Sequence, residues 1–381
     1  DGDMDLFIGS GPAGSLARDF NYRNMLVETA NPFLSRLDTG VLGTDLVDGQ
    51  NYSFIDYDND GDLDAYLTNY RFGTPNNLYR NDGNGYYTKM TAAQVGRIVS
   101  DSGSSLSNVW ADYDNDGDID CYVTNDNSFT TRYYSNNGNG SFTRVDSIAV
   151  RENGPKYGAV AGDYDNDGDV DLYVSGAILT KALYENITGN GNKWVTLKCI
   201  GMSTNKSAIG TRVRVKATIN GQSVWQLREI NSQNSFNSMS MLNVHFGLGN
   251  ASVIDSIIVE WPRSSRQVFT NVSVNSRYNL VEGQNLVSGI EPIEGNIPDR
   301  FELEQNYPNP FNPLTKIEFN LKAAGDVTLK VYDGLGRIVE TLVDQNLSAG
   351  RYSVTFNGNG LSSGIYFYKL LSEAGEAVRK M

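Results

Sequence analysis

The chain has 381 residues, enough for about two to four domains, and its 45 acidic against 31 basic side chains give a net charge of −14. An acidic chain lacks the basic face that a phosphate backbone requires, so we expect no nucleic-acid partner. With one histidine, His245, and two cysteines, the chain cannot build a zinc or iron centre that needs two or three imidazoles, nor a disulfide framework. No apolar run approaches the roughly 18 residues of a membrane-spanning helix, so we expect no membrane span.

The aspartates are concentrated in one repeated motif. The nine-residue segment Asp-Tyr-Asp-Asn-Asp-Gly-Asp-x-Asp begins at Asp56, Asp112 and Asp163, and the chain opens within a truncated copy at residues 1–5. The full copies start 56 and 51 residues apart. A period of this length is typical of propellers and solenoids.

Each period carries signals for several short strands. An alternating apolar stretch, such as Leu63, Ala65 and Leu67, follows each motif and predicts a strand. Further along, Gly-rich and Asn-rich segments at 78–85, 133–140 and 183–191 predict hairpins. Helical periodicity is absent, so each period is expected to hold about four strands, the content of one propeller blade.

The carboxylate spacing within the motif suits a hard cation. Carboxylates at positions 1, 3, 5 and 9 can converge, because the glycine at position 6 takes the positive φ that turns the chain back. Ca²⁺ accepts six to eight oxygens, so we expect about one calcium ion per loop, with position 7 giving its backbone carbonyl and position 9 closing the site. The expected metal-binding residues are Asp1, Asp3 and Asp5; Asp56, Asp58, Asp60, Asp62 and Asp64; Asp112, Asp114, Asp116, Asp118 and Asp120; and Asp163, Asp165, Asp167, Asp169 and Asp171.

Two other interpretations of the motif were weighed. An EF-hand is excluded because position 12 is Leu67, Val123 or Val174 instead of Glu, and because the flanks read as strands. A simple acidic turn is the alternative, since Asp, Asn and Gly also form turns. Five like charges within nine residues repel one another unless a cation neutralises them, which favours the calcium loop.

Over residues 1–185 this repeat resembles the FG-GAP/VCBS calcium loops of integrin-alpha-type β-propellers. The resemblance implies a propeller, a fold that in this family usually closes with about seven blades. Only three to four periods are visible, so we expect an incomplete set of blades, with Asp1 not the native N-terminus and further blades upstream.

The segment 186–286 lacks the aspartate motif and reads as strand-rich. Its passages at 208–215, 245–249 and 254–262 resemble the ASPIC/UnbV domain that follows FG-GAP-type propellers in the cartilage acidic protein family. The resemblance implies a β domain with no assigned chemistry.

A stretch at 287–306 without clear periodicity is expected to be a linker. Residues 307–381 predict a small antiparallel β-sandwich of about seven strands, and they closely resemble the type A C-terminal sorting domain of the type IX secretion system. That resemblance implies recognition by the secretion machinery of a Bacteroidota-like bacterium, and release or anchoring at the cell surface. Millimolar external calcium could then fill the loops. The expected fold is therefore all-β: a calcium-loop propeller followed by two sandwich-like domains.

No residue is nominated as catalytic. Aspartate pairs repeat almost identically, whereas a catalytic site needs one distinct arrangement, and His245 is expected to be structural. Trp194, Trp225 and Trp261 are expected in cores instead of on a sugar platform.

The leading hypothesis is a non-enzymatic, extracellular calcium-binding protein whose propeller serves adhesion or binds a protein or glycan ligand. One alternative is a self-assembling subunit of a filament, sheath or matrix. Another is a carbohydrate-active enzyme whose site lies in missing blades.

Overall fold

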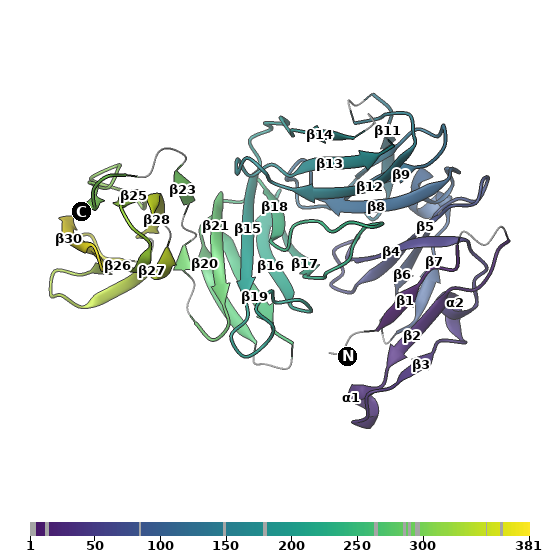
Figure 1. The fold of residues 1–381 in the computed structure, drawn as a ribbon, viewed down its shortest axis with the longest axis horizontal. Coiled ribbons are helices and arrows are strands. Elements are labelled where there is room, and N and C mark those ends of the chain that lie inside the picture. The colour runs from purple at the N-terminus through teal and green to yellow at the C-terminus, as the bar shows by residue number, and fades with distance from the viewer. Residues whose placement is uncertain are drawn as a thin grey trace. The chain divides into compact units, whose positions relative to one another are not determined.

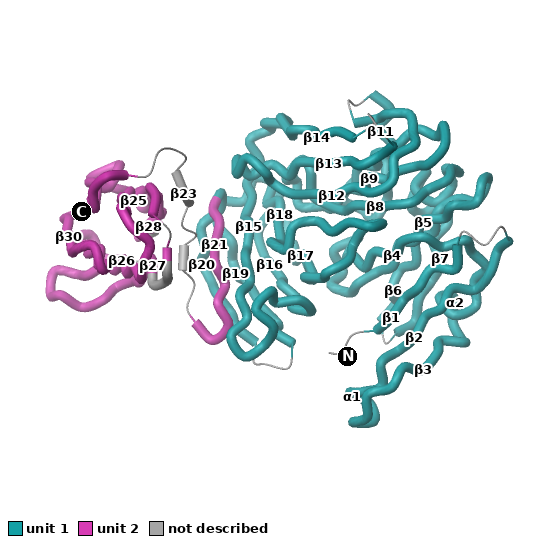
Figure 2. Tube along the Cα trace, in the orientation of Figure 1, with its two compact units in different colours: residues 1–275 teal, residues 276–381 magenta. Residues whose placement is uncertain are grey.

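The structure is a computed structural model that describes residues 5–11, 15–83, 85–147, 150–177, 181–262, 266–284, 287–288, 291–293, 298–347, 349–358 and 361–381. These residues form small antiparallel sheets, which confirms the all-β prediction. The chain divides into two compact units, residues 1–275 and 276–381 (Figure 2). Asp1 and Asp3 lie outside the described residues, so the structure does not place these two expected ligands.

The first part of unit 1 consists of four successive antiparallel sheets, which we call repeat sheets 1 to 4 (Figure 1). In each sheet the strands pair in chain order, as in a meander. Their strands are β1 (Leu6–Ile8), β2 (Phe20–Asn24) and β3 (Leu34–Arg36); β4 (Gly49–Ile55), β5 (Asp64–Asn69), β6 (Asn77–Asn81) and β7 (Tyr87–Lys89); β8 (Ser105–Ala111), β9 (Asp120–Asn125), β10 (Arg132–Asn136) and β11 (Phe142–Val145); and β12 (Lys156–Gly162), β13 (Asp171–Gly176) and β14 (Ala182–Tyr184). Four short helical segments also occur, α1 (Leu26–Thr29), α2 (Gly40–Thr44), α3 (Ala92–Val95) and η1 (Arg97–Val99). Sheets 2 and 3 thus contain the four strands predicted for each period.

In repeat sheets 2 and 3, the second strand contributes to two hydrophobic cores. On β5, Ala65 and Leu67 pack in a cluster with Leu42, which precedes this sheet in the chain. Tyr66, between them, packs in a different cluster with Cys121 of β9 in the next sheet. Because successive strand residues point to opposite faces, each sheet can be apolar on both sides and pack between two neighbours.

The second part of unit 1, which we call the 193–272 domain, follows β14. It comprises β15 (Lys193–Ile200), β16 (Arg212–Ile219), β17 (Gln222–Glu229), β18 (Val244–Gly249), β19 (Ile254–Glu260) and β20 (Gln267–Val272). One sheet has the order β17-β16-β19-β20, and β15 pairs with β18. On β16, Val213 and Val215 are buried while Arg212 and Arg214 alternate with them, so the strand presents arginines on the opposite face.

The boundary expected near residue 185 falls inside unit 1, because the 193–272 domain packs closely on the repeat sheets. The two compact units divide after residue 275, and the domain boundary predicted at residue 286 stays a prediction. Sequence patterns mark where a motif stops, but they do not reveal which segments pack together.

Unit 2 contains a sandwich of two four-stranded antiparallel sheets with the orders β23-β28-β25-β24 and β27-β26-β29-β30. Side chains such as Phe319, Val354, Leu329 and Tyr368 from the two sheets form its core. The strands of this unit are β21 (Ser276–Val281), β22 (Val287–Ser288), β23 (Glu291–Ile293), β24 (Glu302–Leu303), β25 (Leu314–Leu321), β26 (Gly325–Tyr332), β27 (Ile338–Leu347), β28 (Gly350–Asn357), β29 (Phe367–Ser372) and β30 (Gly375–Lys380).

The segment 287–306, expected as a linker, instead supplies two strands of this sandwich. Strand β23 pairs with β28, and β24 pairs with β25. Both lie at the edge of their sheet, where a short strand and a proline, here Pro292, are tolerated. Strands of two or three residues are too short to show an alternating pattern, which is why the sequence did not reveal them.

Within the described ranges, no helix has both the length and the apolar character needed to cross a membrane.

Candidate metal sites

Each aspartate loop joins the first strand of a repeat sheet to the second. In repeat sheet 2, Asp56 follows β4 and Asp64 begins β5. The glycine at position 6 has a positive φ in all three full loops, +93° at Gly61, +108° at Gly117 and +98° at Gly168. The conformation that the sequence predicted for this glycine is therefore present in every copy.

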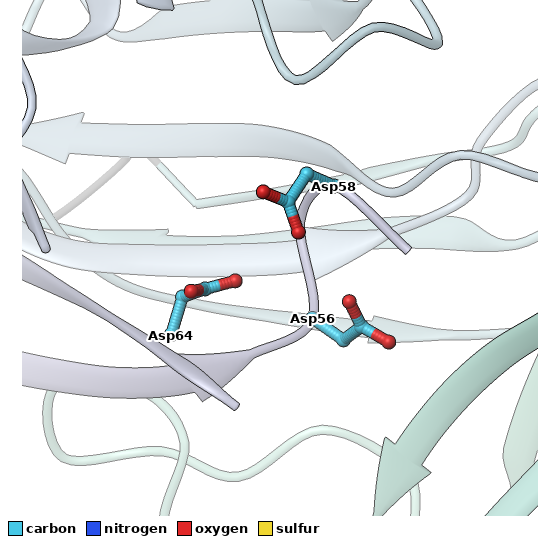
Figure 3. A group of neighbouring side chains, drawn as sticks. All are labelled: Asp56, Asp58 and Asp64. Atoms are coloured by element: carbon cyan, nitrogen blue, oxygen red, sulfur yellow. The ribbon is translucent and has the colours of Figure 1, made fainter. Parts of the chain in front are cut away.

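The loops bring together the carboxylates of positions 1, 3 and 9. In each of three groups, one ligand oxygen from every residue lies within 4.8 Å of the others. Figure 3 shows the first group, in which side chains from the loop and from the start of β5 lie around one shared space. The groups are Asp56, Asp58 and Asp64; Asp112, Asp114 and Asp120; and Asp163, Asp165 and Asp171.

The carboxylates at position 5 make hydrogen bonds within the loop, and their predicted part in binding calcium stays a prediction. They are absent from the three groups found among the described residues. Instead, Asp60 Oδ1 accepts a hydrogen bond from the backbone N–H of Asp62 at 2.9 Å, and the same contact recurs between Asp118 and Asp116. An aspartate side chain that accepts from the N–H two residues on forms an Asx turn, so position 5 braces the loop.

The aspartate at position 7, whose backbone carbonyl is the predicted ligand, links neighbouring loops through its side chain. Asn59 Nδ2 donates to Asp118 Oδ1 at 2.8 Å, and Asn115 Nδ2 donates to Asp169 Oδ1 at 2.8 Å. The same two amides also donate to the carbonyl oxygens of Gly117 and Gly168. The repeated Asn at position 4 was visible in the sequence as the one invariant polar residue of the motif that is not a carboxylate.

The truncated copy contributes a single described residue. Asp5 Oδ1 accepts a hydrogen bond from the backbone N–H of Asn24 at 2.8 Å. The described residues therefore do not build a fourth carboxylate group around Asp5.

Burial makes the metal-free loops electrostatically unfavourable. Burial, the largest cause, raises the pKa of Asp56 to about 7 and that of Asp64 to about 8, and neighbouring loop carboxylates add to both increases. In the second loop, burial and the adjacent carboxylates raise the pKa of Asp112 far above its usual value. In the absence of a cation, burial therefore disfavours the charged form of these carboxylates.

The residues of the first loop fit a calcium ion. Asp56 is buried, and its Oδ1 and that of Asp58 have no hydrogen-bond partner among the described residues. Buried carboxylate oxygens are normally hydrogen-bonded or coordinated to a cation. An all-oxygen donor set suits a hard cation, and calcium tolerates the irregular geometry of such a loop.

The 193–272 domain packs directly on these loops. Arg214 Nη1 donates to the carbonyl oxygen of Gly61 at 3.0 Å, and Gly249 donates its N–H to the carbonyl oxygen of Asn115 at 2.8 Å. A Cβ added at Gly247 would lie 2.0 Å from Asp112 Oδ2, so only glycine allows this approach. The 193–272 domain therefore contacts the aspartate loops of more than one repeat.

His245 and Trp194 belong to the same contact. His245 Nε2 lies 2.7 Å from Asn115 Oδ1, and its Nδ1 lies 3.0 Å from Thr196 Oγ1, so the ring bridges the domain and the second loop. Trp194 stacks near this imidazole, and its indole occupies the position that a Cβ at Gly168 would need. The structural role expected for His245 agrees with these bonds, whereas Trp194 is a loop contact more than a core residue.

A cavity of about 90 Å³ lies between β4 and β17, lined in part by Asp56, Trp110, Arg228 and Asn231. Small-molecule pockets usually exceed about 300 Å³. This cavity has room for about three water molecules.

Three family models match the chain. The FG-GAP-like repeat model matches residues 56–123 and 112–174, the model described as ASPIC and UnbV matches 201–287, and the secretion system C-terminal sorting domain matches 305–381. The chain therefore contains FG-GAP-like repeats, an ASPIC/UnbV domain and a C-terminal sorting domain, which confirms the three predicted resemblances. The sorting domain indicates export by a type IX secretion system to the cell surface or the exterior.

No curated protein sequence matches the chain. One similar solved structure is a lectin of Agrocybe aegerita, described as recognising non-reducing terminal N-acetylglucosamine, with 14% identity, a TM-score of 0.30, and coverage of 70% of this chain and 80% of the lectin. Another is a tetra-tandem repeat from the extending region of a large adhesion protein, with 10% identity, a TM-score of 0.17, and coverage of 91% of this chain and 76% of the other.

Proposed function

We propose that this chain is a secreted, non-enzymatic binding protein whose FG-GAP-like repeats are propeller blades stapled by calcium, with about one ion per aspartate loop. The observation that carries the proposal is the convergence of positions 1, 3 and 9 in three successive loops, with an unpartnered buried oxygen on Asp56. A calcium ion would neutralise the negative charges that these carboxylates bring together.

The residues of each loop have distinct tasks in this proposal. In the first loop, Asp56, Asp58 and Asp64 hold the ion, Asp60 braces the turn, and Gly61 reverses the chain. Because Asp64 begins β5 and Asp56 follows β4, the ion ties two neighbouring strands together. A rigid sheet stack of this kind positions its connecting loops for an extracellular protein or glycan ligand.

The non-enzymatic assignment is supported by the sameness of the three groups. Each group has the same residue types at the same positions, whereas catalysis needs one site with a distinct arrangement. A screen of the purified chain for hydrolase or lyase activity on polysaccharides tests this part, and turnover that a loop variant abolishes would overturn it.

The calcium proposal is tested by counting bound ions and measuring thermal stability in calcium and in chelator. Asp64→Asn should remove one ion and lower the midpoint of unfolding in calcium. Asp82→Asn is the matched control, because Asp82 lies in the same repeat sheet but is bound to Arg80 at the surface. A chain that binds no calcium, or an Asp64→Asn variant with the full ion count, would refute the proposal.

A second candidate function, a self-assembling structural subunit, is favoured by the outer face of repeat sheet 4. Tyr173 in this sheet is 39% exposed, although its equivalent Tyr66 in sheet 2 is fully buried against the following sheet. This face is thus of the kind that elsewhere in the chain packs against a neighbouring sheet.

Contact between two copies through this face would bury it, and the symmetry of that contact decides whether closed oligomers or filaments form. Light scattering in millimolar calcium tests this candidate. Tyr173→Lys should reduce the mass of any assembly, whereas Leu335→Lys, at an exposed position of the sorting domain, should not. A monomer at all concentrations would exclude it.

A further inference from the structure

The ASPIC/UnbV domain has no role in the function proposed above, yet it contacts all three complete aspartate loops. Arg214 of β16 reaches the first loop at Gly61, Gly247 of β18 reaches the second at Asp112, and Trp194 of β15 covers the third at Gly168. One domain therefore contacts all three of these loops.

These contacts depend on the conformation of the loops. Two of the hydrogen bonds end on loop backbone: Arg214 on the Gly61 carbonyl and Gly249 on the Asn115 carbonyl, at 3.0 and 2.8 Å. A third bond of this kind, from Asn192 to the Asp114 carbonyl at 2.9 Å, comes from the residue just before the domain. A backbone carbonyl is in the right place only when the loop is folded. Because a metal-free loop holds closely spaced, buried carboxylates that repel one another, the ion that folds the loop also builds this surface.

A second part of the domain follows the first strands of the repeat sheets. Ser235 Oγ donates to the carbonyl oxygen of Ala159 in β12 at 2.6 Å, and its hydroxyl also bonds to that of Ser107 in β8. Ser53 in β4 donates to the carbonyl oxygen of Asn234 at 3.3 Å. The segment 231–241 thus joins three repeat sheets, so displacement of the domain would affect all of them.

One charge opposes this cooperative coupling. The positive charge of Arg228 acts on Asp112, Asp56 and Asp118, an attraction that a bound dication would weaken. Several contacts favour coupling, whereas one arginine opposes it. Gly247 and Gly249 in particular lie against the folded second loop. The geometry therefore favours positive coupling.

We propose that the 193–272 domain is a clamp that closes over the aspartate loops, so that calcium binding and docking of the domain stabilise each other. The proposal rests on the calcium loops of the proposed function and assigns a role to the ASPIC/UnbV domain. Coupling is reciprocal: if calcium strengthens docking, docking must strengthen calcium binding by the same factor. Because the docked domain holds the loop backbone in its folded conformation, we expect it to slow calcium release.

The test is the rate of calcium release from the full chain, measured by stopped-flow mixing with a fluorescent chelator. Arg214→Ala removes a contact to the first loop without changing a loop residue, and we expect release of at least one ion to accelerate by about tenfold, the effect of losing one hydrogen bond from a charged donor. Arg212→Ala is the matched control, because Arg212 lies on the same strand but pairs with Glu229 at 2.9 Å. Its release rate should stay within about twofold of the unsubstituted chain, since exposed ion pairs contribute little.

A second pair of variants probes the second loop. Gly247→Ala places a Cβ against Asp112 and should accelerate release, whereas Gly334→Ala in the sorting domain has no atom closer than 3.8 Å to its Cβ and should not. Hydrogen exchange gives an independent readout, because chelation should increase exchange in residues 231–241 and 244–249.

The outcomes separate the clamp from the calcium sites themselves. If the unsubstituted chain binds no calcium, the proposed function fails. If it binds calcium but Arg214→Ala and Gly247→Ala release it at the normal rate, the clamp alone is refuted. Slower exchange of residues 244–249 after chelation would also refute it, because the attraction to Arg228 would then dominate.

Discussion

Removing calcium is expected to destabilise unit 1 and leave the sorting domain unchanged. The three carboxylate groups found among the described residues all lie in unit 1. The sandwich of unit 2 is held by an apolar core that includes Ile317, Phe319, Leu329 and Phe356. The two units should therefore respond differently to a chelator.

The expected loss of stability follows from the number of groups. For an extracellular calcium site with a dissociation constant of about 0.1 mM, 2 mM calcium stabilises the folded state by about 2 kcal/mol. Three such groups together contribute roughly 5 kcal/mol, a large part of the 5 to 15 kcal/mol that holds an ordinary domain folded. Unit 1 should consequently unfold at a much lower temperature in chelator.

Differential scanning calorimetry in 2 mM calcium and in excess chelator measures this effect. We expect two transitions, of which the one assigned to unit 1 shifts downward by about 10 °C or more, at about 2 to 4 °C per kcal/mol for a unit of this size. A truncated chain is not needed for the assignment, because Tyr66→Ala should lower the same transition by creating a cavity between repeat sheets. Equal shifts of both transitions, or no shift, would refute the reasoning.

Three further predictions concern pH, a buried thiol and the sorting domain. In chelator, the stability of unit 1 should be greatest below about pH 4 and should fall as pH rises through the raised pKa values of Asp56, about 7, and Asp64, about 8. The stabilisation by calcium should therefore grow from pH 5 to pH 8. Melting curves along a pH series check this, and a constant difference between the curves in calcium and in chelator would contradict it. Cys121 should resist a thiol reagent until the chain unfolds, because burial raises the pKa of its thiol, and peptide mapping after labelling would show any early reaction. Tyr368→Phe should lower the free energy of unfolding of unit 2 by about 1 to 3 kcal/mol, because the hydroxyl accepts a hydrogen bond from the N–H of buried Asn306 at 2.7 Å. An unchanged unit 2 transition in calorimetry would mean that this bond contributes nothing.

The local geometry of the aspartate loops could be predicted from the sequence. Position 6 of the motif must adopt a positive φ, and the structure has this at Gly61, Gly117 and Gly168. The convergence of positions 1 and 9, as in Asp56 and Asp64, was also predictable, because a nine-residue loop between two paired strands brings its ends together. Both features depend only on residues close in the chain.

The hydrogen bonds within and between the aspartate loops could not be predicted from the sequence. The sequence does not reveal that Asp60 braces its own turn or that Asn59 donates to Asp118, since the same residue types also serve as ligands and ordinary turn formers. The strand β23 could not be predicted either, because its partner β28 lies more than 50 residues away and its own pattern is too short.

The sequence by itself determined the repeats, the loop chemistry and the sorting domain, because each is encoded by side-chain types at fixed short spacings. Only the tertiary structure decided that the ASPIC/UnbV domain lies on the aspartate loops. That contact joins Gly247 to Asp112 and Arg214 to Gly61, residues more than 130 positions apart. Such a pair leaves no local signature, because a glycine selected for close approach and a glycine selected for a turn look the same in a sequence.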